Sequence, residues 1–183
     1  MSVPRRTLGH IGEATEDPMC WMCDDPTMTK DDALARMAGL VADHGWALQY
    51  VEGGRVRPPW CYTVGLSLYG VPELLVTGLR SEDSARLLNG MAAHLVDHDG
   101  TLSVGERFVP ADGREYEVVG MPHPDAHLLT TYALMGDLPI RALQLVWSDD
   151  RGHWPWDVGF RSRRGGQPVL GPRAGTPSPR PGT

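Results

Sequence analysis

The clearest hydrophobic pattern in the chain lies between Pro59 and Leu79. From residue 60 to residue 66 the apolar side chains occupy alternate positions, which is typical of a β-strand with one buried face. Residues 67–72 are rich in turn-forming types, and residues 73–79 are nearly continuously apolar, as in a strand that is buried on both faces. We therefore expect two strands joined by a turn at the centre of the fold.

Three segments carry the apolar spacing of amphipathic helices. The first follows Thr29–Asp32, which resembles a capping box, and extends to about His44. The second begins at Ser81, which we expect to cap it, and ends between residues 97 and 100. The third is expected within residues 122–136, where prolines precede an apolar stripe and a glycine follows it.

Further strands are expected on both sides of these helices. In the strand expected last in the chain, Leu143, Leu145 and Trp147 share one face. In the strand before it, Tyr116 alternates with Glu117, so that Glu117 belongs to the opposite face. The expected ranges are 46–51, 105–110, 115–121 and 140–147.

This order of elements favours strand pairs with short connections over a regular alternation of strand and helix. The sequence therefore predicts a single α+β domain, with a mostly antiparallel sheet and about three helices packed on it. We expect the domain to cover residues 19–170. A flexible N-terminal arm is expected over residues 1–18 and a disordered tail over residues 171–183, because neither segment has an apolar pattern.

The composition is that of one soluble globular domain, with 183 residues, 41% hydrophobic and 22% charged. No apolar run approaches the roughly 20 residues that span a bilayer, so we expect no membrane segment. The two arginines near the N-terminus are not followed by the apolar core of a secretory signal. We therefore expect a cytoplasmic protein in which the three cysteines form no disulfide framework.

The net charge of −6 is unevenly distributed along the chain. Residues 151–183 contain six arginines and one aspartate, a net charge of +5, so the first 150 residues carry −11. Because an acidic body repels phosphates, we do not expect DNA binding. The basic end is interpreted as a solvated tail or as a contact with an acidic partner, which leaves another protein as the candidate partner.

Cys20 and Cys23 form a C-x-x-C motif near the N-terminus. Two thiols at this spacing are able to hold one tetrahedral zinc ion or to close a small redox ring, although a second ligand pair is not evident in the sequence. Further ligands would be His10, Asp24 or a histidine brought close by folding, with Asp24 the least favoured. The alternative interpretation is that both cysteines are inert and partly buried.

A second pair of potential metal ligands is His123 and His127, which lie four residues apart. On one turn of a helix, two histidines at this spacing share a face and are able to hold a metal ion together. The prolines on both sides of His123 favour a helix-cap position instead.

Three pieces of sequence together identify a family. They are the W-x-Y-T-V-G-L run at residues 60–66 with P-E-L at 72–74, the Q-L-V-W-x-D strand end at 144–149, and G-x-x-P-W-D at 152–157 with Q-P at 167–168. This combination resembles the bacterial family named domain of unknown function 4262. The C-W-M-C-D prefix at residues 20–24 is similar to its actinobacterial, especially mycobacterial-type, members. The resemblance covers about residues 20–170 and assigns no catalytic residue.

Carboxylates gather in the segment after the last strand, where Asp149, Asp150 and Asp157 accompany His153. Such a group suits acid–base chemistry or metal binding, whereas the alternative, which we favour, is a solvated acidic turn. Glu73 is the one charge near the start of an apolar strand. It is either a buried acid with a raised pKa or a strand-end residue held by hydrogen bonds or an arginine.

Two hypotheses for the function follow. The sequence contains no nucleophile elbow, phosphate loop, dinucleotide fingerprint or zinc-protease motif, which lowers the expectation of an enzyme. The leading hypothesis is a small regulatory or interaction protein with a zinc- or redox-responsive segment at Cys20 and Cys23. The alternative is a hydrolase-like enzyme in which the four residues of the 149–157 segment line one cleft with Glu73.

Overall fold

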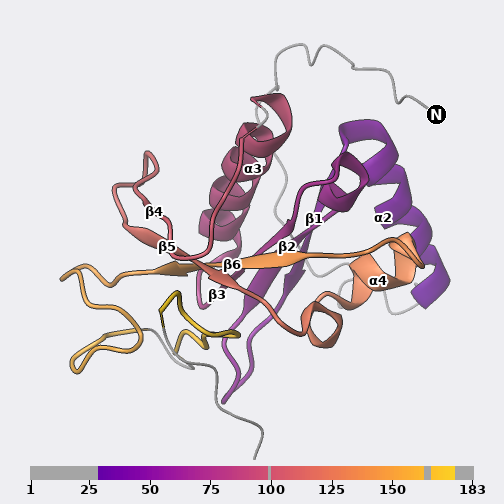
Figure 1. The fold of residues 1–183 in the computed structure, drawn as a ribbon. Coiled ribbons are helices and arrows are strands. Elements are labelled where there is room, and N and C mark those ends of the chain that lie inside the picture. Colours follow the sequence, from indigo (N-terminus) through magenta and orange to yellow (C-terminus); the bar gives the residue numbers. More distant parts are fainter. Residues whose placement is uncertain (1–28, 99, 163–165, 176–183) are drawn as a thin grey trace, which may run out of the picture.

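A computed structural model describes residues 29–98, 100–162 and 166–175 (Figure 1). Within these ranges the α-helices are α2 (Lys30–His44), α3 (Ser81–Asp97) and α4 (Leu129–Met135). Two short 3-10 helices are η1 (Leu66–Tyr69) and η2 (Pro124–Ala126). The strands are β1 (Ala47–Val51), β2 (Trp60–Val64), β3 (Glu73–Thr77), β4 (Arg107–Phe108), β5 (Tyr116–Gly120) and β6 (Ala142–Trp147).

The six strands form one sheet in the order β1-β2-β3-β6-β5-β4. Neighbouring strands are antiparallel, except that β3 and β6 are parallel and join the two halves of the sheet. The predicted single α+β domain, with a mostly antiparallel sheet and three helices, is therefore confirmed for the described residues. The boundary at residue 19 lies outside the described residues, so the expected limits of the domain stay a prediction.

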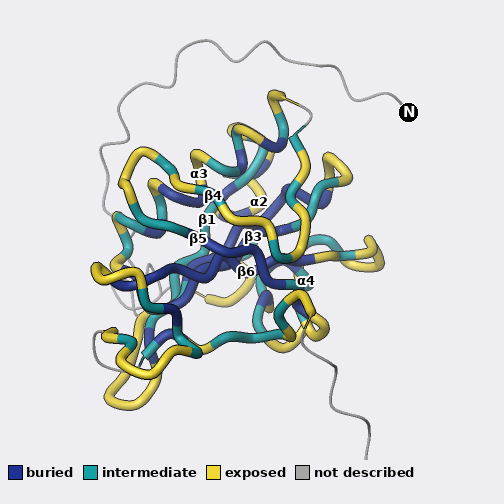
Figure 2. The backbone as a smooth tube through the Cα atoms, turned by 60° about the vertical axis from the view of Figure 1, so that its left-hand side comes forward, coloured by how far each residue is buried: buried dark blue, intermediate teal, exposed yellow. Residues whose placement is uncertain are grey.

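The helices cover opposite faces of this sheet. Leu88 of α3 packs in one core cluster with Leu74 of β3, whereas Val41 of α2 packs in another cluster with Leu75. Because adjacent residues of a strand point to opposite faces, α3 covers one face and α2 covers the other together with α4. Figure 1 shows α3 well separated from α2 and α4, and Figure 2 shows the central strands buried between these layers.

The C-terminal part of the described chain completes the second face beside α2 and α4. Val119 of β5 and Val146 of β6 are fully buried there beneath Trp154. Trp156 and Val169 pack against the same cluster. Trp154, Trp156 and Val169 therefore cover this half of the sheet in place of a helix, so that both faces are covered.

The predicted single buried face of residues 60–66 is wrong. On β2 both faces are buried, since Cys61 is 1% exposed and Thr63 is 0% exposed. The periodicity of the sequence indicated only that Tyr62 and Val64 share one face, which in the structure is the α2 side. It did not report that α3 lies over the opposite face, because that contact is made by residues that are distant in the chain.

Two helix starts also differ from the predictions. Thr29 forms the expected capping box with Asp32, but the N-cap of α3 is Arg80, which makes no side-chain capping bond, and Ser81 is the first helical residue. The third predicted helix begins at Leu129, because the segment around Pro124 forms the separate 3-10 turn η2. Each of the three helices in the described residues is too short or too polar to cross a membrane.

Candidate functional site

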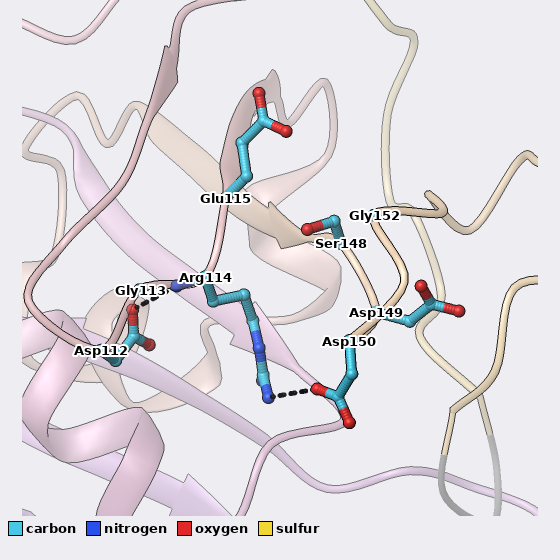
Figure 3. A pocket seen from close by; sticks show the side chains of 8 residues that line it. All are labelled: Asp112, Gly113, Arg114, Glu115, Ser148, Asp149, Asp150 and Gly152. Atoms are coloured by element: carbon cyan, nitrogen blue, oxygen red, sulfur yellow. Dashed lines mark hydrogen bonds and ion pairs between the residues drawn. The ribbon is translucent and has the colours of Figure 1, made fainter.

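A polar pocket lies beyond the C-terminal end of β6. It has a volume of about 340 Å³ and is formed by the turn that precedes β5 and the turn that follows β6 (Figure 3). The two turns are joined by the backbone N–H of Ser148, which donates to the carbonyl oxygen of Glu115 at 3.0 Å. The lining residues are Asp112, Gly113, Arg114, Glu115, Ser148, Asp149, Asp150 and Gly152.

Asp149 uses both carboxylate oxygens to hold the turn after β6. One oxygen accepts from the backbone N–H groups of Arg151 (2.9 Å) and His153 (2.8 Å), and the other accepts from that of Arg161 (3.0 Å). Burial alone would raise the pKa of Asp149, but these N–H groups and the nearby His153 ring lower it to about 2. Asp149 is thus an ionised acceptor with no oxygen left for a proton transfer at neutral pH.

Asp150 is a carboxylate of this pocket that faces solvent. Its side chain is 96% exposed and lies 3.7 Å from the guanidinium of Arg114, the ion pair drawn in Figure 3. Arg114 in turn lies over the ring of Trp147, 4.9 Å from the ring centroid. An ion pair this exposed contributes little to stability, so Asp150 and Arg114 are the pocket groups that are free to meet a ligand.

Asp112 fixes the opposite wall of the pocket. Its two oxygens accept from the backbone N–H of Arg114 (3.0 Å) and from the hydroxyl of Tyr116 (2.8 Å). Burial and the hydrogen bond to Asp112 both raise the pKa of the Tyr116 hydroxyl above its usual value, so this tyrosine stays a neutral donor. The arrangement anchors the start of β5 rather than offering an acid or a base.

The other two residues of the predicted cluster also have local roles. The Asp157 carboxylate accepts from the backbone N–H of Trp154 at 2.8 Å. Nδ1 of His153 lies 3.4 Å from an Asp149 oxygen, and the His153 side chain is 40% exposed. The structure thus brings Asp149, Asp150 and His153 together in one turn, while the Asp157 carboxylate closes the next one.

Glu73 lies at the other end of the sheet from these residues. β3 and β6 are parallel and Glu73 pairs with Ala142 at the start of β6, whereas Asp149 follows the end of β6. The structure therefore does not place Glu73 in a common cleft with the 149–157 segment. Whether any residue of that segment is catalytic stays a prediction.

Glu73 itself is a fully buried carboxylate that ties three segments together. One oxygen accepts from the hydroxyl of Thr63 (2.6 Å), and the other accepts from the backbone N–H of Gly65 (3.1 Å) and from both the N–H and the hydroxyl of Ser67 (2.9 Å each). Gly65 has a φ of 118°, and a Cβ there would lie 3.0 Å from the carbonyl oxygen of Gly45, so this turn requires glycine.

The pKa of Glu73 is raised, because the cost of burying its charge exceeds the stabilisation by these four hydrogen bonds. The sequence left two interpretations of Glu73 open, a buried acid with a raised pKa or a strand-end residue held by hydrogen bonds or an arginine. In the structure Glu73 is a buried acid that is also held by hydrogen bonds at the start of its strand. Its hydrogen-bond donors are Thr63, Gly65 and Ser67.

The predicted metal ligands Cys20 and Cys23 lie outside the described residues, as do His10 and Asp24. The third cysteine, Cys61, is buried in the α3-side core, and burial raises the pKa of its thiol to about 12. In the described part of the chain, no three His, Cys, Asp or Glu side chains are grouped to hold a metal ion. His123 and His127 flank the 3-10 turn η2, one as its N-cap and the other as its C-cap.

The sequence did not reveal a network built around Glu117, whose side chain is only 4% exposed. Its carboxylate pairs with Arg107 at 2.8 Å and with Arg173 at 3.1 Å. These two arginines lie over Trp154 and Trp156, which stack on each other with ring centroids 5.3 Å apart. The assignment of Glu117 to the face opposite Tyr116 was the available signal. Its partners Arg107 and Arg173 lie 10 and 56 positions away in the chain, beyond the reach of local patterns.

The fold and the pocket define a small α+β domain whose buried carboxylates organise turns. The chain belongs to the family described as domain of unknown function (DUF4262), whose sequence model matches residues 40–161. The predicted family is thus confirmed. Comparison with curated proteins gives no match, and comparison with solved structures gives none.

Proposed function

We propose that this protein is a regulatory or interaction protein in which Cys20 and Cys23 form a zinc- or redox-responsive segment. The observation that supports this proposal is that the other candidate side chains are already hydrogen-bonded or buried. Asp149 and Glu73 have their oxygens engaged by hydrogen-bond donors, and Cys61 is buried with a pKa of about 12. Cys20 and Cys23 are then the thiols that remain for metal or redox chemistry.

The chemistry of the two thiols explains how such a segment would respond. Zinc binds thiolates, so binding releases protons and is lost when the sulfurs are oxidised. Oxidation of a C-x-x-C pair joins the two sulfurs in a disulfide and gives up two electrons to the oxidant. A reducing cytoplasm, the location that we propose, keeps both thiols available for either event. Another protein is the partner that would read the change.

The first test counts reactive thiols in the untagged full-length chain with an aromatic disulfide reagent. We expect two thiols to react in the native protein and the third to react only after unfolding, because a buried thiol with a raised pKa is both shielded and protonated. Cys61→Ser provides the matched control and leaves the two fast thiols unchanged. A native count of one in the Cys61→Ser variant, or slow reaction of both remaining thiols, contradicts the proposal.

The second test adds one equivalent of zinc before the thiol reagent and measures bound metal after gel filtration. We expect zinc to slow both fast thiols and to remain with the protein, and Cys20→Ser to abolish both effects. The redox form of the proposal predicts instead that mild oxidation removes both fast thiols together and that a reductant restores them. If zinc gives no protection and oxidation forms no reversible disulfide, the segment is inert and the proposal fails.

A further inference from the structure

The last turn of α3 carries two exposed histidines on the same face. His94 and His98 are four residues apart, and their rings stack with centroids 5.6 Å apart and planes inclined by 26°. His98 is the C-cap of α3, and its backbone N–H donates to the carbonyl oxygen of His94 at 3.3 Å, the hydrogen bond that closes the last turn. The stacking shows that both imidazoles project from the helix in the same direction.

Two imidazoles in this arrangement form a chelate for late first-row divalent cations. Side chains four residues apart on an α-helix are neighbours, and the same i, i+4 histidine spacing supplies two zinc ligands in helical metal sites. Imidazole nitrogen suits Zn²⁺, Ni²⁺ and Cu²⁺, which bind nitrogen ligands more tightly than Mn²⁺ or Mg²⁺. The second ligand is already held near the first, which raises affinity over that of a single histidine.

The backbone of Gly100 lies close to the edge of the His94 ring. A Cβ at position 100 would lie 3.0 Å from both Cδ2 and Nε2 of His94. Glycine has no such atom, so the backbone at residue 100 approaches this edge of the ring more closely than any other residue type would allow. A side chain at position 100 would crowd Nε2 of His94.

The pair His123 and His127 has the same spacing and lacks this geometry. These two residues flank the 3-10 turn η2 rather than lying on an α-helix. Only Pro124–Ala126 lie in the turn, and His123 has a φ of −129° and a ψ of 65°, so the four-residue spacing does not place the two side chains on one face of an α-helix. The chain thus offers its own control, with two equally spaced histidine pairs of which one has α-helical placement.

We propose that His94 and His98 form a bidentate surface site for Zn²⁺ and related divalent cations. No third His, Cys, Asp or Glu side chain joins them among the described residues. The remaining coordination positions are then open to water or to a donor from a second molecule, which is the arrangement through which a surface metal ion links two proteins. This site is separate from the proposed thiol segment and does not depend on it.

The test uses the full-length chain with Cys20 and Cys23 both replaced by serine, so that thiolates cannot bind the metal. Ni²⁺ is the probe, and its affinity is measured by calorimetric titration together with the unfolding midpoint Tm. We expect one Ni²⁺ per chain and a rise in Tm of about 3 °C at saturating metal, since only the folded helix presents both ligands together. His94→Ala and His98→Ala, each alone, are expected to lower the affinity at least about tenfold.

His123→Ala is the matched control and is expected to leave Ni²⁺ affinity and the Tm shift unchanged. Both α3 histidines are exposed, so the variants keep the fold, and circular dichroism without metal checks this. If the chain without Cys20 and Cys23 binds no Ni²⁺, or if His94→Ala binds it as tightly as the parent, the site does not exist. Zinc protection of the thiols in a His94→Ala, His98→Ala chain tests the thiol segment separately, so the two proposals fail independently.

Discussion

At the scale of single residues, the buried acids of this protein act as organisers of the backbone. Glu73 accepts hydrogen bonds from the end of β2, from η1 and from the Thr63 hydroxyl, and it does so with an exposed fraction of 0%. Asp149 does the same for the turn after β6. The pKa values of the two carboxylates shift in opposite directions. The cost of burial outweighs the hydrogen bonds at Glu73 and raises its pKa, whereas hydrogen bonds from backbone N–H groups outweigh burial at Asp149 and lower its pKa.

Replacement of Glu73 tests this role. Glu73→Ala leaves the N–H groups of Gly65 and Ser67 buried without an acceptor, and we expect a loss of about 3 kcal/mol in the free energy of unfolding. Glu73→Gln keeps an oxygen acceptor for these donors and is expected to cost only about 1 kcal/mol. Urea unfolding measures both, with the exposed Glu52→Gln as control. Equal effects of the three substitutions would show that the carboxylate does not hold the turn.

The raised pKa of Glu73 adds a dependence on pH. The folded state takes up the proton more readily than the unfolded state, whose value is close to 4.5, so this contribution to stability is complete below pH 4.5. It is lost as pH rises through the raised value of the folded state. Measured between pH 7 and pH 4.5, the unfolding free energy of the natural protein should therefore rise relative to that of Glu73→Gln. A constant difference between the two proteins would contradict the raised pKa.

At the scale of elements, side-chain amides replace a strand beside β6. The β3–β6 pairing covers only residues 73–75 and 142–144. At the end of β6, the side chain of Gln167 hydrogen-bonds to the backbone of Trp147 instead. Its amide donates to the carbonyl oxygen of Trp147 and accepts from the N–H of Trp147, both at 2.8 Å. Gln144 holds the same segment through the carbonyl oxygen of Pro168 and the N–H of Leu170, both at 2.7 Å. Residues 167–170 are thereby fixed against the sheet although they form no strand.

Gln167→Ala should therefore lower the free energy of unfolding strongly, although it removes no apolar side chain. It leaves a buried N–H and a buried carbonyl of Trp147 without partners, and we expect a loss of about 2–4 kcal/mol in the free energy of unfolding. The matched control is Gln49→Ala on the edge strand β1, because the Gln49 amide donates only to the carbonyl of its neighbour Tyr50. Equal shifts in the urea midpoint for the two variants would show that water replaces the Gln167 amide.

The same scale shows what the sequence could predict about the elements. The strand over residues 140–147 and the shared face of Leu143, Leu145 and Trp147 were predictable, because all three side chains meet α3 in one core cluster. The capping box at Thr29 was predictable from four adjacent residues. The double burial of β2 and the partners of Gln167 were not, since each depends on segments that meet only after folding.

At the scale of the whole molecule, the sequence predicted the α+β class but not the strand order. Short connections indicate antiparallel neighbours, which holds for four of the five strand pairs and fails at β3–β6, the parallel pair in the middle. The parallel pairing of β3 and β6 also explains why the sequence grouped the wrong residues in the candidate site. The sequence placed Glu73 with the carboxylates of residues 149–157, but the parallel pairing of β3 and β6 puts the start of one strand far from the end of the other.

The middle position of β6 has a consequence for how the protein is made. β6 pairs with β3 on one side and with β5 on the other, and translation reaches it only after both neighbours. Until β6 has been synthesised, we expect the nascent chain to hold two separate parts of the sheet, in which Leu75 of β3 and Val118 of β5 lack the strand that neighbours them in the folded protein. We expect the nascent protein to need a chaperone during this interval, which ends once β6 and the segments that cover it have been added.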